Sequence, residues 1–309
     1  MQLTLRVTIL PAMRHHLRQS DFEIYENGEL QEIGYFGPAE TPRSLLLVFD
    51  VTGVMDSQGP FMVQGMNVFL ANLRDQDRVG VGVMGPEFEM LMDFRKLEKG
   101  KPVNVRLPRE RIGSNLYESL DMASRRFNKE QGRKAIIAMT DGRETRMFNE
   151  TQKLGKVLDL ADDSDFKKWL KDARKRGVPY YFIALDTDPR YMGRYDYEYA
   201  FLKNPDGYLR SPLYANAMRN PNIAEEYLAG VRLRLEKLAE ATGGRVIYQK
   251  SLEDVVALYG QIAAELGYSY SLGYSPKVSN SNEKVRRIEV RVKEPSLKVE
   301  QSRTSYSQE

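Results

Sequence analysis

Residues 44–54 read SLLLVFDVTGV, and this stretch decides the fold class. Five apolar residues follow Ser44 without a polar interruption, and the run ends at Asp50. A strand without polar alternation is typical of a parallel sheet, because helices cover both faces of such a sheet. Comparable apolar runs occur at residues 78–84, 134–139, 178–185 and 245–248.

Stretches with helical spacing separate these runs. Apolar residues recur every three or four positions across residues 62–73, which indicates a helix with one buried side. Ser164 is expected to cap a further helix, which Gly177 ends. A turn within residues 81–94 adds one antiparallel edge strand. The alternation of strands and helices predicts an α/β fold with a doubly wound, mostly parallel sheet of the Rossmann-like type.

The two ends of the chain have a different pattern. Asn27 and Gly28 stand between apolar stretches, which is a strong signal for a β-hairpin. The cluster Arg286, Arg287 and Arg291 is interpreted as the solvated face of a strand. Alternation of apolar and polar residues, typical of strands with one buried face, occurs at residues 3–9, 268–274 and 288–292.

These patterns divide the chain into a central domain and an accessory one. We predict an α/β domain at residues 41–267 that carries an insertion at 187–222. Residues 1–40 and 268–309 are expected to pack together as an antiparallel β-sandwich, because a small sheet at either end would be marginal alone. Two separate ribbons are the alternative arrangement.

Composition excludes several classes of protein. The 309 residues include 46 basic and 43 acidic side chains, a net charge of +3 that argues against a dedicated nucleic-acid surface. Cysteine is absent, so disulfides and thiolate metal sites are excluded. No apolar run reaches the roughly 18 to 20 residues of a membrane span. Residues 1–10 lack the basic start of a signal peptide, so we expect either a cytoplasmic protein or one from which a leader is missing.

Four oxygen-bearing side chains follow the predicted strands. Asp50 and Thr52 come after the first apolar strand, Ser114 begins a helix, and Asp141 follows the strand at residues 134–139. Ligands of open α/β sheets bind beyond the carboxyl ends of the strands, so these side chains are expected to converge. Carboxylates and hydroxyls without histidine or cysteine form a hard site, which suits Mg²⁺ and, as alternatives, Mn²⁺ or Ca²⁺.

This set of residues resembles the metal-ion-dependent adhesion site of von Willebrand factor A domains. In that family a first loop reads Asp-x-Ser-x-Ser, a second supplies Thr and a third supplies Asp. Asp50 matches the first Asp, Thr52 the first Ser, Ser114 the Thr and Asp141 the last Asp. The departure is Val54, which stands where the second Ser belongs and offers no oxygen. The resemblance therefore implies a weakened metal site.

The resemblance extends along the chain. Residues 21–28, 238–245 and 270–276 resemble the von Willebrand-type proteins abundant in Acidobacteria. It implies a non-enzymatic adhesion or scaffold module that binds a protein ligand, with a ligand carboxylate completing the metal shell. It also favours the cell envelope as the location.

Two other functions remain open. A scaffold with a vestigial metal site would contact its partners through other surfaces. A phosphohydrolase of the haloacid dehalogenase type would use Asp50 as nucleophile and Thr140 to bind phosphate. The second acid of that family is Thr52 here, and its late acidic pair would have to be Asp162 and Asp163, which precede a helix rather than follow a strand.

The insertion at residues 187–222 is the candidate for partner contacts. It is longer than the roughly 12 to 15 residues usual for structureless loops, and such loops tend to be functional or disordered. Tyrosine and arginine carry much of the energy of protein interfaces. Packing of the tyrosines on the domain's own surface is the alternative. The residues expected to bind a partner are Tyr191, Tyr195, Tyr197, Tyr199, Arg190 and Arg194.

Overall fold

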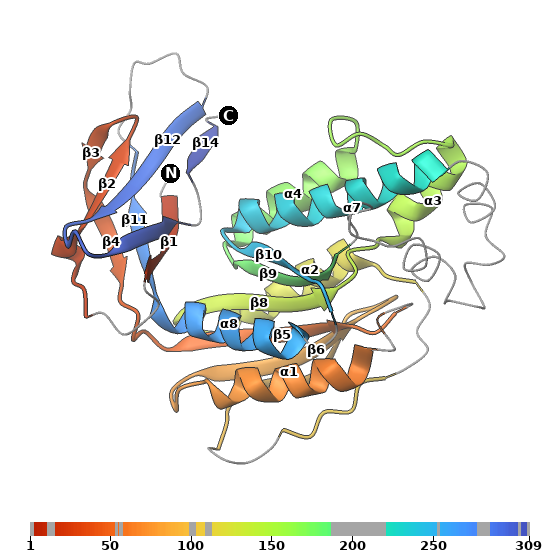
Figure 1. The fold of residues 1–309 in the computed structure, drawn as a ribbon, viewed down its shortest axis with the longest axis horizontal. Helices are drawn as coiled ribbons and strands as arrows, with labels where there is room; N and C mark the ends of the chain where they lie inside the picture. Colours follow the sequence, from red (N-terminus) through yellow and green to blue (C-terminus); the bar gives the residue numbers. More distant parts are fainter. Residues whose placement is uncertain are drawn as a thin grey trace. The chain divides into compact units, whose positions relative to one another are not determined.

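The computed structural model describes residues 3–10, 16–52, 55, 58–98, 103–108, 113–186, 221–251, 254–276, 285–301 and 304–307. The chain divides into two compact units (Figure 1). One unit is continuous, Pro42–Gly260, and the other combines the two ends, Met1–Thr41 and Gln261–Glu309.

The continuous unit is built on a six-stranded sheet with the order β10-β9-β8-β5-β6-β7. All neighbouring pairs are parallel except β6 and β7, so the predicted antiparallel edge strand is confirmed. Every residue of the central strand β5 is buried, which is why its sequence lacks polar alternation. The bounds are β5 Arg43–Asp50, β6 Arg78–Met84, β7 Glu89–Lys96, β8 Arg133–Thr140, β9 Tyr180–Leu185 and β10 Arg245–Gln249.

Helices cover both faces of this sheet. On one face, Tyr259 of α8 contacts both Phe49 of β5 and Phe69 of α1, with ring centroids 6.3 Å apart in each pair. On the other face α2, α4 and α7 share one apolar core with Leu46 and Ile136. The fold is therefore the predicted doubly wound one. The bounds are α1 Gly59–Ala71, α2 Leu116–Arg125, α3 Thr145–Leu154, α4 Ser164–Arg176, α7 Pro221–Thr242 and α8 Asp254–Tyr268.

The start of α4 corrects one expectation about helix caps. The residue that caps it is Asp163 rather than Ser164, because the Asp163 carboxylate accepts a hydrogen bond of 2.9 Å from the backbone N–H of Phe166. Gly177 ends the helix with a φ of 65°, as predicted. Within the residues described, no helix is both long enough and apolar enough to cross a bilayer.

The second unit contains two antiparallel four-stranded sheets, β13-β1-β11-β4 and β14-β12-β2-β3. Apolar residues of both sheets form one buried cluster, which includes Leu5, Ile24, Leu272 and Val290. The predicted sandwich of the two chain ends is therefore present. Its strands are β1 Leu3–Leu10, β2 Phe22–Glu26, β3 Glu29–Gln31, β4 Ile33–Gly37, β11 Ser269–Tyr274, β12 Val285–Val292, β13 Lys298–Gln301 and β14 Ser305–Ser307.

Positive backbone φ angles confirm the predicted hairpin between β2 and β3. Asn27 has a φ of 49° and Gly28 a φ of 85°. Two-residue hairpin turns with positive φ at both positions favour Asn followed by Gly, since other residues are strained there. The local sequence therefore sets the register in which Glu26 lies opposite Glu29.

The arginine cluster of β12 is only partly solvated, which corrects the prediction. Arg287 and Arg291 are exposed, but Arg286 lies on the inner face with Ile288 and is 1% exposed. There its guanidinium forms an ion pair with Glu26. The period of two along a strand alternates inward and outward residues, so Arg286 shares the buried face. A buried charge needs a partner, and Glu26 supplies it.

Candidate metal centre

Asp50 is the last residue of β5, and its side chain is completely buried. The Thr52 hydroxyl donates a hydrogen bond of 2.6 Å to Asp50 Oδ1, and the Thr52 backbone N–H donates to the same oxygen at 3.1 Å. The Thr140 hydroxyl, at the end of the adjacent strand β8, donates to Asp50 Oδ2 at 2.7 Å. Both carboxylate oxygens are therefore held in place by hydroxyls.

Asp141 follows β8 and is also buried. Its Oδ1 accepts a hydrogen bond of 3.0 Å from the backbone N–H of Arg143, and the Arg143 Nε lies 3.6 Å from its Oδ2. Both side chains of this ion pair are nearly inaccessible to solvent, with exposures of 7% and 5%. The sequence did not indicate this contact, since arginine after an Asp-Gly turn is ordinarily solvated. Arg143 places a fixed positive charge beside Asp141.

The charge of Asp141 acts on Asp50. Burial and the negative charge of Asp141 raise the pKa of Asp50, and the hydrogen bonds from Thr52 and Thr140 lower it, so that the net pKa is about 7. Thr140, whose hydroxyl donates to Asp50, directly precedes Asp141, so the ends of β5 and β8 bring the two acids into neighbouring loops. A cation between them would favour the charged form of Asp50.

Ser114 supplies the clearest indication of a ligand. Ser114 is 6% exposed, and its hydroxyl makes no hydrogen bond within the part of the chain that the structure describes. The Ser114 backbone is well held, because its N–H donates to Thr145 Oγ1 at 2.8 Å and its carbonyl accepts from the Thr145 N–H at 2.9 Å. Burial of a hydroxyl without a hydrogen-bond partner costs free energy. A group that accepts a hydrogen bond from the Ser114 hydroxyl, or a cation that its oxygen coordinates, would therefore stabilise the site.

These donors fit a hard divalent cation. Asp50, Thr52, Ser114 and Asp141 would hold it through carboxylate and hydroxyl oxygens, the ligand type that Mg²⁺, Mn²⁺ and Ca²⁺ prefer. Among the described residues no group of three His, Cys, Asp or Glu side chains could hold a metal ion. A cation here would therefore depend on the two hydroxyls as well as on the two acids.

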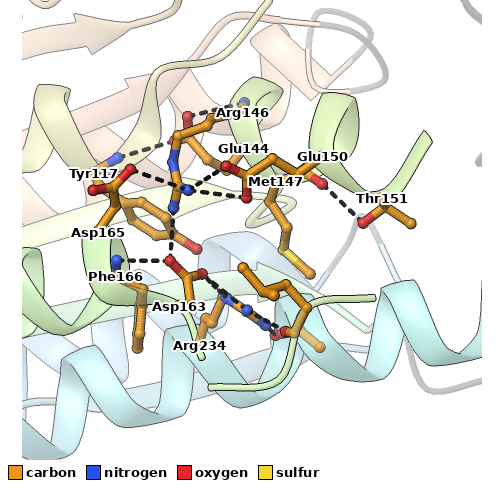
Figure 2. Close-up of polar contacts among 12 residues, drawn as sticks. Tyr117, Glu144, Arg146, Met147, Glu150, Thr151, Asp163, Asp165, Phe166 and Arg234 are labelled. Atoms are coloured by element: carbon orange, nitrogen blue, oxygen red, sulfur yellow. Dashed lines mark hydrogen bonds and ion pairs between the residues drawn. The ribbon is translucent and has the colours of Figure 1, made fainter. Parts of the chain in front are cut away.

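Glu144 is a buried acid that the sequence analysis did not single out. Its Oε2 accepts a hydrogen bond of 3.2 Å from the Tyr117 backbone N–H, and its Oε1 accepts one of 3.4 Å from the Arg146 N–H (Figure 2). One carboxylate therefore caps both α2 and α3, whose first turns follow Ser114 and Asp141. Burial raises the pKa of Glu144 to about 7, although these hydrogen bonds lower it. The sequence does carry a signal for the role of Glu144, because it is an acidic residue immediately before a helix, where a negative charge is favoured.

Figure 2 also shows an ion network close to Glu144, centred on Asp163. Asp163 accepts from Arg146 Nη2 at 3.0 Å through one oxygen and from Arg234 Nη2 at 3.0 Å through the other. Burial raises the pKa of Asp163, but the helix cap and the two arginines lower it more, so the net shift is downward. The Asp163 carboxylate thus joins α3, α4 and α7. This structural use leaves it unsuited to the acid-base role of a phosphohydrolase.

Gly142 explains why the loop after Asp141 lies so close to α7. Its φ is +79°, and a Cβ atom built there would lie 2.6 Å from Leu235 Cδ1 and 2.9 Å from Val231 Cγ1. Glycine alone satisfies both the backbone conformation and the close approach. The conformation of the loop after Asp141 therefore depends on a helix nearly a hundred residues later in the chain.

The other predicted binding residues cannot be placed. Val54, the position that departs from the metal-site motif, lies outside the described residues. The same holds for the six tyrosine and arginine residues proposed for partner binding within residues 187–222. Of that insertion the structure describes Pro221 and Asn222, the first two residues of α7.

Comparison with solved structures identifies the fold. The von Willebrand factor type A protein from Catenulispora acidiphila is 11% identical, with a TM-score of 0.51, over 93% of this chain and 72% of its own. The ArnB paralog VWA2 from Sulfolobus acidocaldarius is 9% identical over 93% of this chain and 75% of its own, with a TM-score of 0.44. The PilB minor pilin from Streptococcus sanguinis is 12% identical over 74% of this chain and 62% of its own, with a TM-score of 0.47.

The first of these similarities shows that the chain has a von Willebrand factor A-like fold, as the sequence motifs implied. At 11% identity it establishes the fold and not the function. No family model matches the sequence, and no curated protein does either.

Proposed function

We propose that this chain is a non-enzymatic protein-binding module. In this proposal Asp50, Thr52, Ser114 and Asp141 hold a divalent cation, with Mg²⁺ preferred, and a carboxylate of a protein ligand completes its shell. The observation that carries the proposal is the buried Ser114 hydroxyl without a hydrogen-bond partner in the described residues. It belongs to a loop that Thr145 ties to the loop of Asp141.

The contacts of the acids favour binding over catalysis. A phosphohydrolase needs a nucleophilic carboxylate and a second acid next to it. Both oxygens of Asp50 accept hydrogen bonds from hydroxyls, and the neighbouring position holds Thr52 in place of an acid. Asp163 is engaged by Arg146 and Arg234. Hydrolysis of p-nitrophenyl phosphate with Mg²⁺, lost in Asp50→Asn, would revive the enzyme hypothesis.

A vestigial site is the second candidate, and Arg143 favours it. Its guanidinium lies 3.6 Å from Asp141 Oδ2, so a cation is already present beside one proposed ligand. In that case the module would contact its partners through other surfaces, without metal.

Isothermal titration with Mg²⁺ and Mn²⁺ tests the proposal with a matched pair of variants. Ser114→Ala removes the unpaired hydroxyl and should weaken cation binding at least about tenfold, because one direct ligand is lost. Ser119→Ala is the control, since Ser119 of α2 is also buried and its hydroxyl also lacks a partner among the described residues. Equal binding by the two variants would show that the cation does not use the Ser114 hydroxyl, and no binding by the wild type would support the vestigial site.

The resemblance to von Willebrand factor A proteins also leads us to propose the cell envelope as the location of this protein. Immunoblotting of fractionated cells tests this. Recovery in the soluble cytoplasmic fraction alone would contradict it.

A further inference from the structure

A cavity of about 320 Å³ opens between the start of α1 and the segment 103–108. Among the described residues that line it, Arg106 alone has a polar side chain. The apolar lining includes Val51, Met55, Met62, Val63, Val105 and Leu107. The volume lies at the lower end of the range for small-molecule pockets, and it is larger than an ordinary packing defect.

The cavity adjoins the first loop of the proposed metal centre. Val51 stands between Asp50 and Thr52 in the chain, and it is one of the residues that line the cavity. Leu107, another lining residue, belongs to the segment 103–108, which precedes Ser114 in the chain. A ligand group bound at the oxygen donors would therefore have an apolar recess beside it.

Gly59 is the lining position at which a side chain can be added most simply. It lines the cavity at the first position of α1, and a Cβ atom built there meets no atom within 4 Å. Its φ is not in the left-handed region. Neither backbone conformation nor packing therefore requires glycine at this position, so a larger side chain can be placed beside the recess.

We propose that this cavity takes a leucine-sized apolar side chain of an acidic ligand segment whose carboxylate binds at the metal centre. The inference rests on the proposed function and adds the chemistry of the ligand next to its carboxylate. Arg106 is exposed and lines the cavity, so its guanidinium and a cation bound at Asp50 would both place positive charge near the apolar recess. That arrangement is complementary to an apolar residue flanked by acids.

Burial of the side chain sets the size of the expected preference. Burial of the leucine side chain removes apolar surface from water and favours binding, and the ordering of the ligand offsets part of that gain. We therefore expect a leucine-containing segment to bind about tenfold more tightly than its serine analogue, since about 1.4 kcal/mol corresponds to a factor of ten.

The test uses the full chain labelled with ¹³C in its methionine methyl groups, because Met55 and Met62 both line the cavity. Their signals are assigned by Met55→Leu and Met62→Leu. Buried Met139 of β8 and Met147 of α3 report any general change. The probes are N-acetyl-leucinamide, acetate, and acetylated tetrapeptide amides that contain Leu-Asp or Asp-Leu, each with a serine analogue, in Mg²⁺ or in EDTA.

N-acetyl-leucinamide should shift the Met55 and Met62 signals with or without Mg²⁺, and the leucine peptides should bind about tenfold more tightly than the serine peptides. Gly59→Leu should fill the recess and abolish both effects. Gln64→Leu is the control, because it adds the same side chain at an exposed position of α1 outside the cavity lining. Arg106→Gln should weaken the binding of the peptides and leave the signal shifts caused by N-acetyl-leucinamide unchanged.

The outcomes separate this inference from the proposed function. EDTA-sensitive peptide binding without a leucine preference would overturn the cavity proposal and leave the metal centre intact. A leucine preference that EDTA does not change would contradict the proposed metal centre and support the cavity as the binding site. If no probe shifts Met55 or Met62 and no peptide binds, both fail.

Discussion

The Glu144 carboxylate accepts a hydrogen bond of 3.2 Å from the backbone N–H of Tyr117, so the residue that caps α3 also holds the first turn of α2. Ser114 precedes α2 and Asp141 precedes α3. A single buried acid therefore couples the two loops that carry proposed metal ligands, in addition to the paired hydrogen bonds between Ser114 and Thr145.

Removal of this double cap should cost stability and metal affinity together. Glu144→Ala is expected to lower the free energy of unfolding by about 2 to 3 kcal/mol, because two helix starts lose their acceptor. Glu144→Gln keeps an oxygen at the same place and should cost less. Urea unfolding measures the loss of stability in both variants. Equal losses in the two variants would show that charge rather than hydrogen bonding is what Glu144 contributes.

The pH dependence of Glu144 follows from its raised pKa. The neutral form is favoured in the folded state up to about pH 7, against 4.5 in the unfolded chain. The stability from this shift is fully present below pH 4.5 and is lost as pH rises through 7. The stability of the wild type relative to Glu144→Gln should therefore fall over that window. A constant difference would contradict the shift.

Cation binding should release a proton from Asp50. Burial and the charge of Asp141 raise its pKa to about 7, and a bound cation needs the carboxylate ionised. Affinity for Mg²⁺ should therefore rise between pH 5.5 and about 7 and then level off. Calorimetry in two buffers of different ionisation enthalpy counts the proton. Affinity that is independent of pH would show that the cation binds elsewhere.

Gly142→Ala should be more destabilising than an ordinary glycine substitution. The positive φ costs about 1 to 2 kcal/mol in an alanine, and the collision with Leu235 and Val231 adds about 1 to 3 kcal/mol. Gly177→Ala is the matched control, because its φ is +65° and its added Cβ meets nothing within 4 Å. The difference in melting temperature between the two variants measures the effect of the collision. Equal melting temperatures would show that α7 moves aside without loss of stability.

The sandwich should depend on the buried acid Glu26. Its carboxylate pairs with Arg286 and accepts hydrogen bonds from Tyr274 at 2.7 Å and Tyr306 at 3.1 Å. Glu26→Gln leaves the Arg286 charge without its counterion on the inner face of the sandwich and should lower stability strongly. Glu289→Gln breaks the exposed pair with Arg291 and should lower stability much less. Similar effects in a chemical denaturation series would contradict the assigned burial.

The insertion supplies a prediction that rests on sequence alone. Replacement of Tyr195, Tyr197 and Tyr199 by Ala should weaken capture of a protein partner and leave the melting temperature nearly unchanged, since aromatic anchors at an interface add little to folding. Pulldown from an envelope extract, with and without EDTA, measures capture. A large drop in melting temperature with capture intact would place these rings in the domain's own core.

The sequence by itself determined the elements and the order in which they occur. Unbroken apolar runs specified strands covered on both faces, and Asn27-Gly28 specified a hairpin, because these signals act within a few residues. The sequence also indicated that Asp50 and Asp141 would meet, since the carboxyl ends of parallel strands share one edge. The influence of the Asp141 charge on Asp50 agrees with that expectation.

Tertiary structure decided the contacts between residues far apart in the chain. Arg143 pairs with Asp141, Glu144 caps two helices, and Arg286 turns inward to Glu26, although each resembles an ordinary surface charge in sequence. The recess at Gly59 likewise exists only once α1 lies beside residues 103–108. Local periodicity fixes which way a side chain points relative to its own element. Whether that direction meets solvent, a counterion or an empty space depends on elements that only folding brings alongside.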